Sequence, residues 1–304
     1  MSHPVTQSES DRLVDTVAEV FRTGKAFKTR DHALLFVCGG PVGPTDTSLR
    51  REFLEYASKE LPAFRVFLSE LAAQDLTRSR RPKFFNLATF EELLSEVAEC
   101  VLIFVESAGS IAELGYFAKS DEISAKLLIV NDLGVQTRES FINNGPVQLI
   151  NGKSAFQPTV HINPKNAASE FRFIKERLNR FDKRYREGIS FKPIGELERQ
   201  DQLFLILEII KVFRVIDVHG IIHLLTRWCG QPDEEKVRQL ISVLMAAGYV
   251  RRLSGNSHMF AMCPDIKSFI ELDGFAVETF RLELADHYRR HASQLYGLLE
   301  EAGS

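Results

Sequence analysis

The first half of the chain alternates short apolar runs with amphipathic segments. The apolar runs predict buried strands at 33–37, 64–68, 100–105 and 126–131. Apolar residues recur at the spacing of one helix face in the segments between and before them, which predicts helices at 9–23, 53–61, 89–99 and 110–120. Strands that are apolar throughout and alternate with helices indicate a parallel sheet covered on both faces. We therefore predict an α/β fold with a Rossmann-like, doubly wound parallel sheet, to which 147–150 and 159–162 add a fifth strand or an edge hairpin.

A long basic helix is predicted next, at 165–187, ending at Gly188. Its cationic side chains outnumber its acidic ones, and the ordinary interpretation of such a charge run is a solvated face. It is nevertheless the surface best suited to meet phosphate groups, together with the basic loop at 78–83. We single out Arg177, Arg180 and Arg184 as candidate contacts with nucleic acid or a partner.

The pattern changes again after residue 195. Three further helices are predicted at 201–213, 218–228 and 233–247, followed by a strand pair at 250–253 and 259–263 with a Gly-Asn turn. This order is typical of a winged helix-turn-helix, whose third helix reads DNA in transcription factors. Here that helix begins with three acidic residues, so we favour docking to a protein over reading of bases, and a transcription regulator is disfavoured.

A final helix is predicted at 275–302. We accordingly divide the chain into a catalytic domain at 1–164, a basic connecting helix and linker at 165–200, and an α-rich winged-helix docking domain with its terminal helix at 201–304.

Two carboxylates, Glu106 and Glu113, flank a turn of small residues. Glu106 ends the third apolar strand and Glu113 falls in the first turn of the helix predicted after it. One interpretation of Glu113 is structural, because Ser110-x-x-Glu113 is a capping box. The other is catalytic, with Glu106 orienting a sugar or tuning Glu113, and crowding of these two like charges should raise the pKa of one of them.

The carboxyl ends of parallel strands converge, which brings further candidates to this edge of the sheet. Gly39 and Gly40 follow the first strand and would let a ligand approach the backbone. Glu70 follows the second strand and suits either a contact with the substrate or a solvated loop acid. Asn143 lies in an Asn-Asn-Gly-Pro segment that suits either a plain turn or the lining of a pocket.

Several common chemistries have no signature in the sequence. The glycine patterns of dinucleotide-binding and P-loop proteins are missing, as are the H-E-x-x-H spacing of zinc proteases and the G-x-S-x-G elbow of hydrolases. Carboxylates without a metal suit chemistry at a glycosidic bond, where an acid attacks or stabilises an oxocarbenium-like carbon. A nucleotide sensor that binds without cleaving is the alternative.

Composition adds bounds on location and partners. The formal net charge of the 304 residues is −3, so attraction to nucleic acid requires a local patch. The four cysteines form no C-x-x-C pair, which is typical of reduced thiols in a cytosolic protein. The sequence starts without the features of a signal peptide and contains no apolar run that could span a membrane. We expect a cytoplasmic protein.

The motif Gly109-Ser-Ile-Ala-Glu113-Leu-Gly-Tyr116 resembles the nucleophile motif of nucleoside 2-deoxyribosyltransferases, and Phe36-Val-Cys-Gly-Gly-Pro41 resembles their first loop. These motifs, followed by Arg138-Glu-Ser-Phe-Ile-Asn-Asn-Gly-Pro-Val147 and a winged-helix half, are together similar to the effector proteins of type II bacterial retrons. Two departures argue against transferase activity itself: Glu106 stands where the transferases commonly have Asp, and Phe36 replaces a tyrosine.

The resemblance implies an antiphage N-glycosidase that cleaves NAD, as substrate rather than cofactor, or a related nucleotide. It assigns the nucleophile to Glu113, the ribose-binding turn to Glu106, Ser107, Gly109 and Ser110, and the first loop to Gly39 and Gly40. It also implies restraint by a reverse transcriptase and its branched RNA–DNA product, msDNA, and it leaves a homo-oligomer or filament open. No metal and no membrane are implied.

Overall fold

A computed structural model describes residues 8–29, 32–79, 86–133, 139–180, 186–189, 192–264 and 266–303. The chain forms two compact units. The sheet unit spans 32–183, and the helical unit combines 1–31 with 184–304. The predicted boundaries at 164 and 200 differ from this division, because they place the N-terminal segment with the sheet and separate the basic helix from it.

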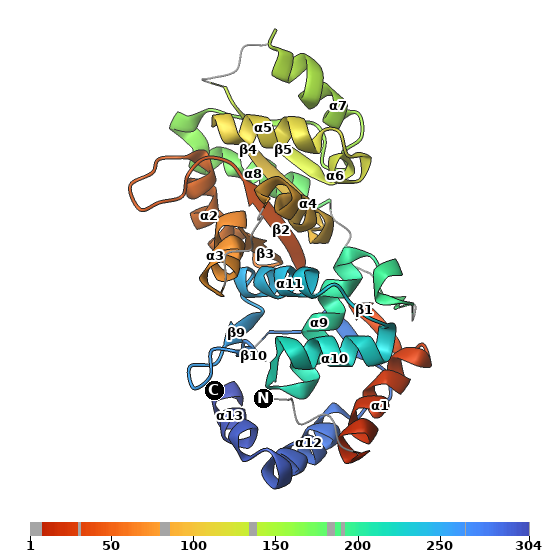
Figure 1. The fold of residues 1–304 in the computed structure, drawn as a ribbon. Coiled ribbons are helices and arrows are strands. Elements are labelled where there is room, and N and C mark those ends of the chain that lie inside the picture. The colour runs from red at the N-terminus through yellow and green to blue at the C-terminus, as the bar shows by residue number, and fades with distance from the viewer. Residues whose placement is uncertain are drawn as a thin grey trace. The chain divides into compact units, whose positions relative to one another are not determined.

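The sheet unit is built on five parallel strands, as predicted (Figure 1). The strands lie in the order β3, β2, β4, β5, β6. Their bounds are β2 (Ala33–Cys38), β3 (Phe64–Phe67), β4 (Cys100–Val105), β5 (Leu127–Asp132) and β6 (Val160–Ile162). The chain adds β3 on one side of β2 and then crosses to β4 on the other side. In open parallel sheets, ligands bind where the strand order reverses in this way, at the carboxyl ends of the strands.

Apolar residues on both faces of the sheet are buried. On one face, Leu35, Leu102 and Phe104 pack with α2 (Leu49–Glu60) and α8 (Ala167–Leu178). The strand residues that alternate with them are buried as well, and α4 (Leu87–Val97) and α5 (Ala108–Phe117) contact β2 and β4. The short helices α3 (Ser69–Ser79) and α6 (Asp121–Ala125) complete the connections.

Two expectations about this unit are wrong. Residues 147–150 are helical rather than extended, in the π-helix η1 (Asn143–Val147) and the short α7 (Gln148–Asn151). Only Val147 and Ile150 of this stretch are buried, and that spacing fits one face of a helix. The basic helix is shorter than predicted, because α8 ends at Leu178 and 186–188 forms a strand. Buried Phe171 and Ile174 fix α8 to the sheet, so it is part of this unit and not a linker.

The helical unit contains a small antiparallel sheet that the sequence pattern did not reveal. Strand β1 (Ala26–Thr29) pairs with β11 (Ile270–Leu272) on one side and with β7 (Arg186–Gly188) on the other. The sheet thereby joins the segment that follows α1 (Ser8–Arg22) to the C-terminal half of the chain. Within it, buried Lys28 forms ion pairs with Asp201 (2.6 Å) and Glu187 (3.4 Å).

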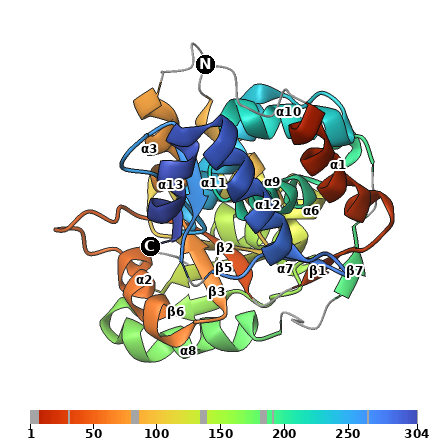
Figure 2. The ribbon, with the colours of Figure 1, turned by 90° about the horizontal axis from the view of Figure 1, so that it is seen from below.

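The rest of the helical unit follows the predicted order of three helices and a strand pair. The elements are α9 (Arg199–Phe213), β8 (Ile216–Asp217), α10 (Val218–Cys229), α11 (Glu234–Ala246), β9 (Val250–Arg252) and β10 (Met259–Met262), and the strands form a sheet in the order β8, β10, β9. The assignment as a winged helix stays a prediction. The terminal helix is divided at Ala292 into α12 (Val277–His291) and α13 (Ser293–Gly303), and α12 contacts α1, α9 and α13 (Figure 2). No helix in the described parts of the chain is both long and apolar enough to cross a membrane.

Candidate active site

The helix that carries Glu113 begins earlier than the sequence suggested. Ser107 is the N-cap of α5, and its hydroxyl accepts a hydrogen bond from the Ser110 amide (3.1 Å). The Ser110 hydroxyl in turn accepts from the amides of Ser107 (3.0 Å) and Glu106 (3.2 Å). The capping box is therefore Ser107 with Ser110, and the predicted box of Ser110 with Glu113 is wrong. The hydroxyls of Ser107 and Ser110 form the hydrogen bonds of the cap, so Glu113 does not cap the helix.

Glu113 has the environment of a functional acid. Its Oε2 atom is buried and has no hydrogen-bond partner among the described residues. Burial raises the pKa of Glu113 to about 7, with a further contribution from the charge of Glu91. The charge of Glu70 also raises this pKa. The charge of Arg50 and a hydrogen bond from the Cys38 thiol lower it. A carboxyl group at this pKa is present in both protonation states at neutral pH, which suits a catalytic acid or nucleophile.

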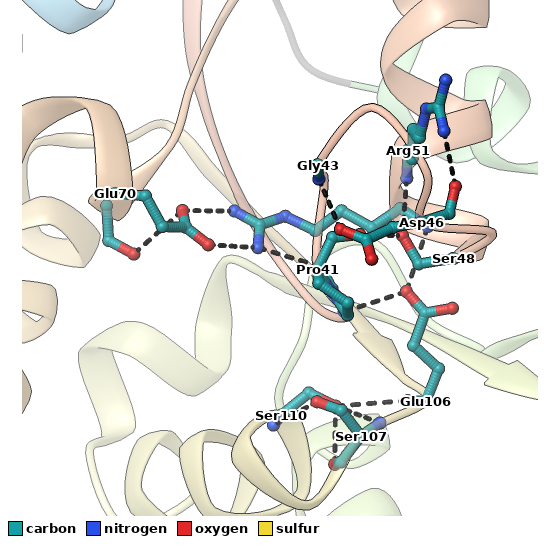
Figure 3. A network of polar contacts seen from close by, with 12 residues as sticks. Pro41, Gly43, Asp46, Ser48, Arg51, Glu70, Glu106, Ser107 and Ser110 are labelled. Atoms are coloured by element: carbon teal, nitrogen blue, oxygen red, sulfur yellow. Dashed lines mark hydrogen bonds and ion pairs between the residues drawn. The ribbon is translucent and has the colours of Figure 1, made fainter.

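The carboxylate of Glu106 accepts hydrogen bonds from main-chain amides of the segment that follows β2. Its Oε1 accepts hydrogen bonds from the amides of Gly40 (2.9 Å) and Arg50 (3.1 Å) (Figure 3). Its Oε2 accepts a hydrogen bond from the amide of Leu49 (2.6 Å). We call this set of contacts the Glu106 clasp. The expected crowding between Glu106 and Glu113 is wrong, because the carboxylates that act on Glu113 are Glu91 and Glu70.

Both glycines of the loop have close protein neighbours where a side chain would begin. A Cβ on Gly40 would lie 2.9 Å from Glu106 Oε1, and one on Gly39 would lie 2.9 Å from the Cβ of Phe104. The predicted approach of a ligand to these glycines stays a prediction. Gly109 differs, since an added Cβ would meet only the Ser107 hydroxyl, at 3.8 Å. Its predicted contact with a ligand stays a prediction.

Glu70, predicted to bind substrate, forms a two-pronged ion pair with buried Arg50. The guanidinium nitrogens lie 2.7 and 2.8 Å from the two carboxylate oxygens, and one of them also donates to the Gly40 carbonyl oxygen (3.3 Å) (Figure 3). Burial alone would raise the pKa of Glu70, but the hydrogen bonds and charge of Arg50 lower it. Arg50 thus connects Glu70 to the Glu106 clasp, and its charge also reaches Glu113.

Sequence reasoning missed Arg50 and Glu91, although both carry a signal. Arg50 lies in the first turn of α2, where a positive charge interacts unfavourably with the helix dipole. A cation at this position therefore indicates a partner elsewhere that stabilises it. Glu91 is 7% exposed and shares the buried face of α4 with Leu94. Burial raises the pKa of Glu91, and a hydrogen bond with Ser69 opposes that rise. A charged residue on the apolar stripe of a helix is a recognisable exception.

A model of the family described as "STM3845 retron effector protein" matches residues 46–252. That match covers more than half of the chain. The chain belongs to this retron effector family.

Two Escherichia coli proteins are similar to this chain. One, named "Retron Ec73 putative ribosyltransferase/DNA-binding protein", is 35% identical over 121 residues, or 40% of this chain and 38% of that protein. The other, named "Retron Ec86 putative ribosyltransferase/DNA-binding protein", is 27% identical over 180 residues, or 56% and 57%. The matches therefore span from under two fifths to just over half of these relatives' lengths.

In this retron effector, Asn143 lies at the carboxyl end of β5. Its side-chain oxygen accepts a hydrogen bond from the side-chain amide nitrogen of Asn131 (3.2 Å), the penultimate residue of β5. Asn131 is fully buried, and its own Oδ1 has no partner among the described residues. The prediction that Asn143 belongs to the ligand-facing edge of the sheet fits this position, but contact with a ligand stays a prediction.

The basic candidates of the retron effector are only partly described. Arg177 and Arg180 both donate to the segment before β6, at the carbonyl oxygens of Pro158 (3.5 Å) and Gln157. Arg180 is exposed and Arg177 half-buried. Arg184 lies outside the described residues, as does most of the basic loop at 78–83. Their predicted role as contacts for nucleic acid stays a prediction.

Proposed function

We propose that this retron effector is an N-glycosidase that acts in antiphage defence, with NAD or a related nucleotide as its substrate. The observation that carries the proposal is the half-buried side chain of Glu113, whose Oε2 atom is buried without a partner among the described residues and whose pKa is raised to about 7. Groups whose pKa values are shifted in this way cluster at functional sites. Glu113 follows β4, beside the reversal in strand order where ligands of parallel sheets bind.

The reaction breaks the bond between the anomeric carbon of ribose and the ring nitrogen of nicotinamide. This nitrogen is already positively charged in NAD, so it keeps the bonding electron pair and leaves as neutral nicotinamide without first being protonated. Positive charge develops on the anomeric carbon, and the carboxylate of Glu113 stabilises it or attacks it. Water supplies the oxygen of the product, ADP-ribose, and releases one proton.

The surrounding residues keep Glu113 able to perform this step. Burial and the charge of Glu91 favour its protonated form, whereas Arg50 and the Cys38 thiol favour the carboxylate. In a site of low polarity, a carboxylate attracts a developing cation more strongly than it would in water. The Glu106 clasp fixes the main chain around Gly40 and Arg50, so that Arg50 stays in place.

The test is release of nicotinamide from NAD by the purified protein, alone and with its retron partners. We expect Glu113→Gln to reduce the turnover number at least about 10³-fold, because an amide cannot supply the negative charge. Glu122→Gln, a change of an exposed acid on α6, is the matched control and should turn over as the wild type does. Equal turnover by wild type and Glu113→Gln would overturn the catalytic role of Glu113.

A transferase is the second candidate, because the names of both E. coli relatives include ribosyltransferase activity. In that case the anomeric carbon passes to an acceptor other than water, as in a nucleoside deoxyribosyltransferase. Mass spectrometry of the products with added free bases and DNA separates the two candidates. If NAD binds tightly but no free base is released under any of these conditions, the result would support the alternative of a non-catalytic nucleotide-sensing and docking module.

We also propose that reverse transcriptase and msDNA are the partners that restrain the enzyme. The names of the two relatives include DNA binding, and α8 offers exposed basic residues. If Arg177 and Arg180 meet nucleic acid, replacing both with Gln should weaken association and lower its dependence on salt. Unchanged, salt-independent association would exclude this surface.

A further inference from the structure

The last helix of the chain contacts the turn that joins β9 and β10. The carboxylate of Glu301, on α13, accepts hydrogen bonds from the amide of Ser254, from the Ser254 hydroxyl (2.6 Å) and from the amide of Gly255 (3.1 Å). Three donors from one turn thus converge on a single anionic group. These hydrogen bonds lower the pKa of Glu301, so the group is ionised at neutral pH.

Arginines contact both α13 and the turn. Arg251 donates to the carbonyl oxygen of Glu301, and Arg214 donates to that of Leu299 (3.2 Å). Arg252 donates to the carbonyl oxygen of Ser257 (2.6 Å), and its guanidinium lies 4.8 Å from the centre of the Phe260 ring. Successive backbone amides, a hydroxyl and arginines are the donors that bind phosphate groups in many proteins.

Gly255 permits this arrangement. An added Cβ would lie 3.1 Å from Glu301 Oε2 and 3.1 Å from a methyl group of Leu298, closer than ordinary contacts. The absence of a side chain therefore lets the carboxylate of Glu301 reach the amide of Gly255. Glu300, the residue before Glu301, is exposed. Among the described turn residues 254–257, none forms a hydrogen bond with Glu300.

We propose that the turn at 254–257 is a binding site for a phosphodiester group of DNA, and that Glu301 occupies this site in the free protein. The inference rests on the nucleic-acid partner proposed above. An incoming phosphate takes over the donors of Ser254 and Gly255 and displaces the carboxylate of Glu301. Leu295 and Leu299 keep α13 packed meanwhile, since both are buried and only the Glu301 side chain has to turn away.

The mechanism makes Glu301 an internal competitor of DNA. Removing its charge should expose the site, whereas removing the neighbouring charge of Glu300 should change only the general repulsion of DNA. The pair Glu301→Gln and Glu300→Gln therefore forms a matched comparison, with the same change in net charge one residue apart.

The experiment measures binding of a fluorescent DNA oligonucleotide to the full chain by anisotropy at several salt concentrations. We expect Glu301→Gln to lower Kd about tenfold and Glu300→Gln to lower it less than about twofold, because only the first variant unblocks a direct phosphate contact. Adding Ser254→Ala to Glu301→Gln should reverse most of the gain. Competition with inorganic phosphate shows whether a free phosphate suffices or the DNA backbone is required.

Equal binding by the two glutamine variants, or no binding by either, would overturn the inference. Thermal unfolding of each variant confirms that the fold is intact. The outcome is separable from the proposed function, because release of nicotinamide is measured without DNA. Weaker DNA binding after replacement of Arg177 and Arg180, with no difference between the two glutamine variants, would support the nucleic-acid partner and exclude this site.

Discussion

Glu106 and Glu113 lie on either side of one small turn, yet their surroundings are opposite. The carboxylate of Glu106 accepts three main-chain hydrogen bonds and holds a loop in place. The side chain of Glu113 is half-buried, its buried Oε2 has no partner among the described residues, and its pKa is raised. An acid that satisfies backbone amides contributes to stability, whereas a buried carboxyl oxygen without a partner costs free energy. The comparison supports the proposal that Glu113 performs the chemistry, and it gives Glu106 the role of holding the loop in place.

Removing Glu106 should have the larger effect on stability. We expect Glu106→Ala to lower the free energy of unfolding by about 2–4 kcal/mol, because amides of Gly40, Leu49 and Arg50 lose a charged acceptor. Chemical denaturation of the purified variant measures this loss. Glu55→Ala, which changes an exposed acid in the middle of α2, is the control and should unfold as the wild type does. A similar stability of both variants would mean that the clasp contributes nothing.

Replacing Glu113 should change stability in the opposite direction. The pKa of its carboxyl group is about 7 in the folded protein and about 4.3 when unfolded, so the folded state binds the proton more tightly. The wild type should therefore lose stability as pH rises between these values, and the loss is complete above about pH 7. We expect Glu113→Gln to be more stable than the wild type by roughly 1–3 kcal/mol near pH 8, with little difference near pH 4. Denaturation at both pH values checks this, and destabilisation by Glu113→Gln at high pH would contradict it.

The sequence pattern predicted the parallel strands of the sheet unit and the order of the helices in the helical unit. Strands such as Val101–Val105 are apolar throughout because both faces of a parallel sheet are buried, and that pattern is local in the sequence. Strands β1 and β7 were missed because each is very short and owes its existence to pairing with distant segments. The end of α8 was misplaced because basic residues continue past Leu178 without a local stop signal.

The site was predicted in its location but not in its contacts. Glu113, Glu106 and Gly40 were placed at one edge of the sheet, as the parallel topology requires. Which acid meets backbone amides and which stays buried depends on the loop before α2, and no spacing in the sequence encodes that. Serine caps are also ambiguous, since Ser107 and Ser110 both precede the helix, and only the hydrogen bonds distinguish them.

Glu91 should set the protonation of Glu113 more strongly than the other charges do. Its charge raises the pKa of Glu113, so Glu91→Gln should lower that pKa. If the carboxylate form is active, the rate of nicotinamide release rises with pH through the pKa of Glu113, and the variant should reach its full rate at lower pH. Glu122→Gln, the change of an exposed acid on α6 that served as a control above, is the control here too. A profile that does not move, or moves to higher pH, would show that Glu91 is not coupled to the reacting acid.

The smallest expected effect concerns the Cys38 thiol, whose hydrogen bond lowers the pKa of Glu113. A thiol is a weak donor and a hydroxyl a stronger one, so two nearly isosteric changes should act in opposite directions. Cys38→Ser should lower the pKa of Glu113, because a better donor stabilises the carboxylate, whereas Cys38→Ala should raise it. Carbon NMR of the labelled glutamate carboxyl groups, with Glu113→Gln to assign the signal, measures both shifts without relying on turnover. Shifts of the same sign in the two variants would mean that packing around β2, and not the hydrogen bond, links Cys38 to the acid.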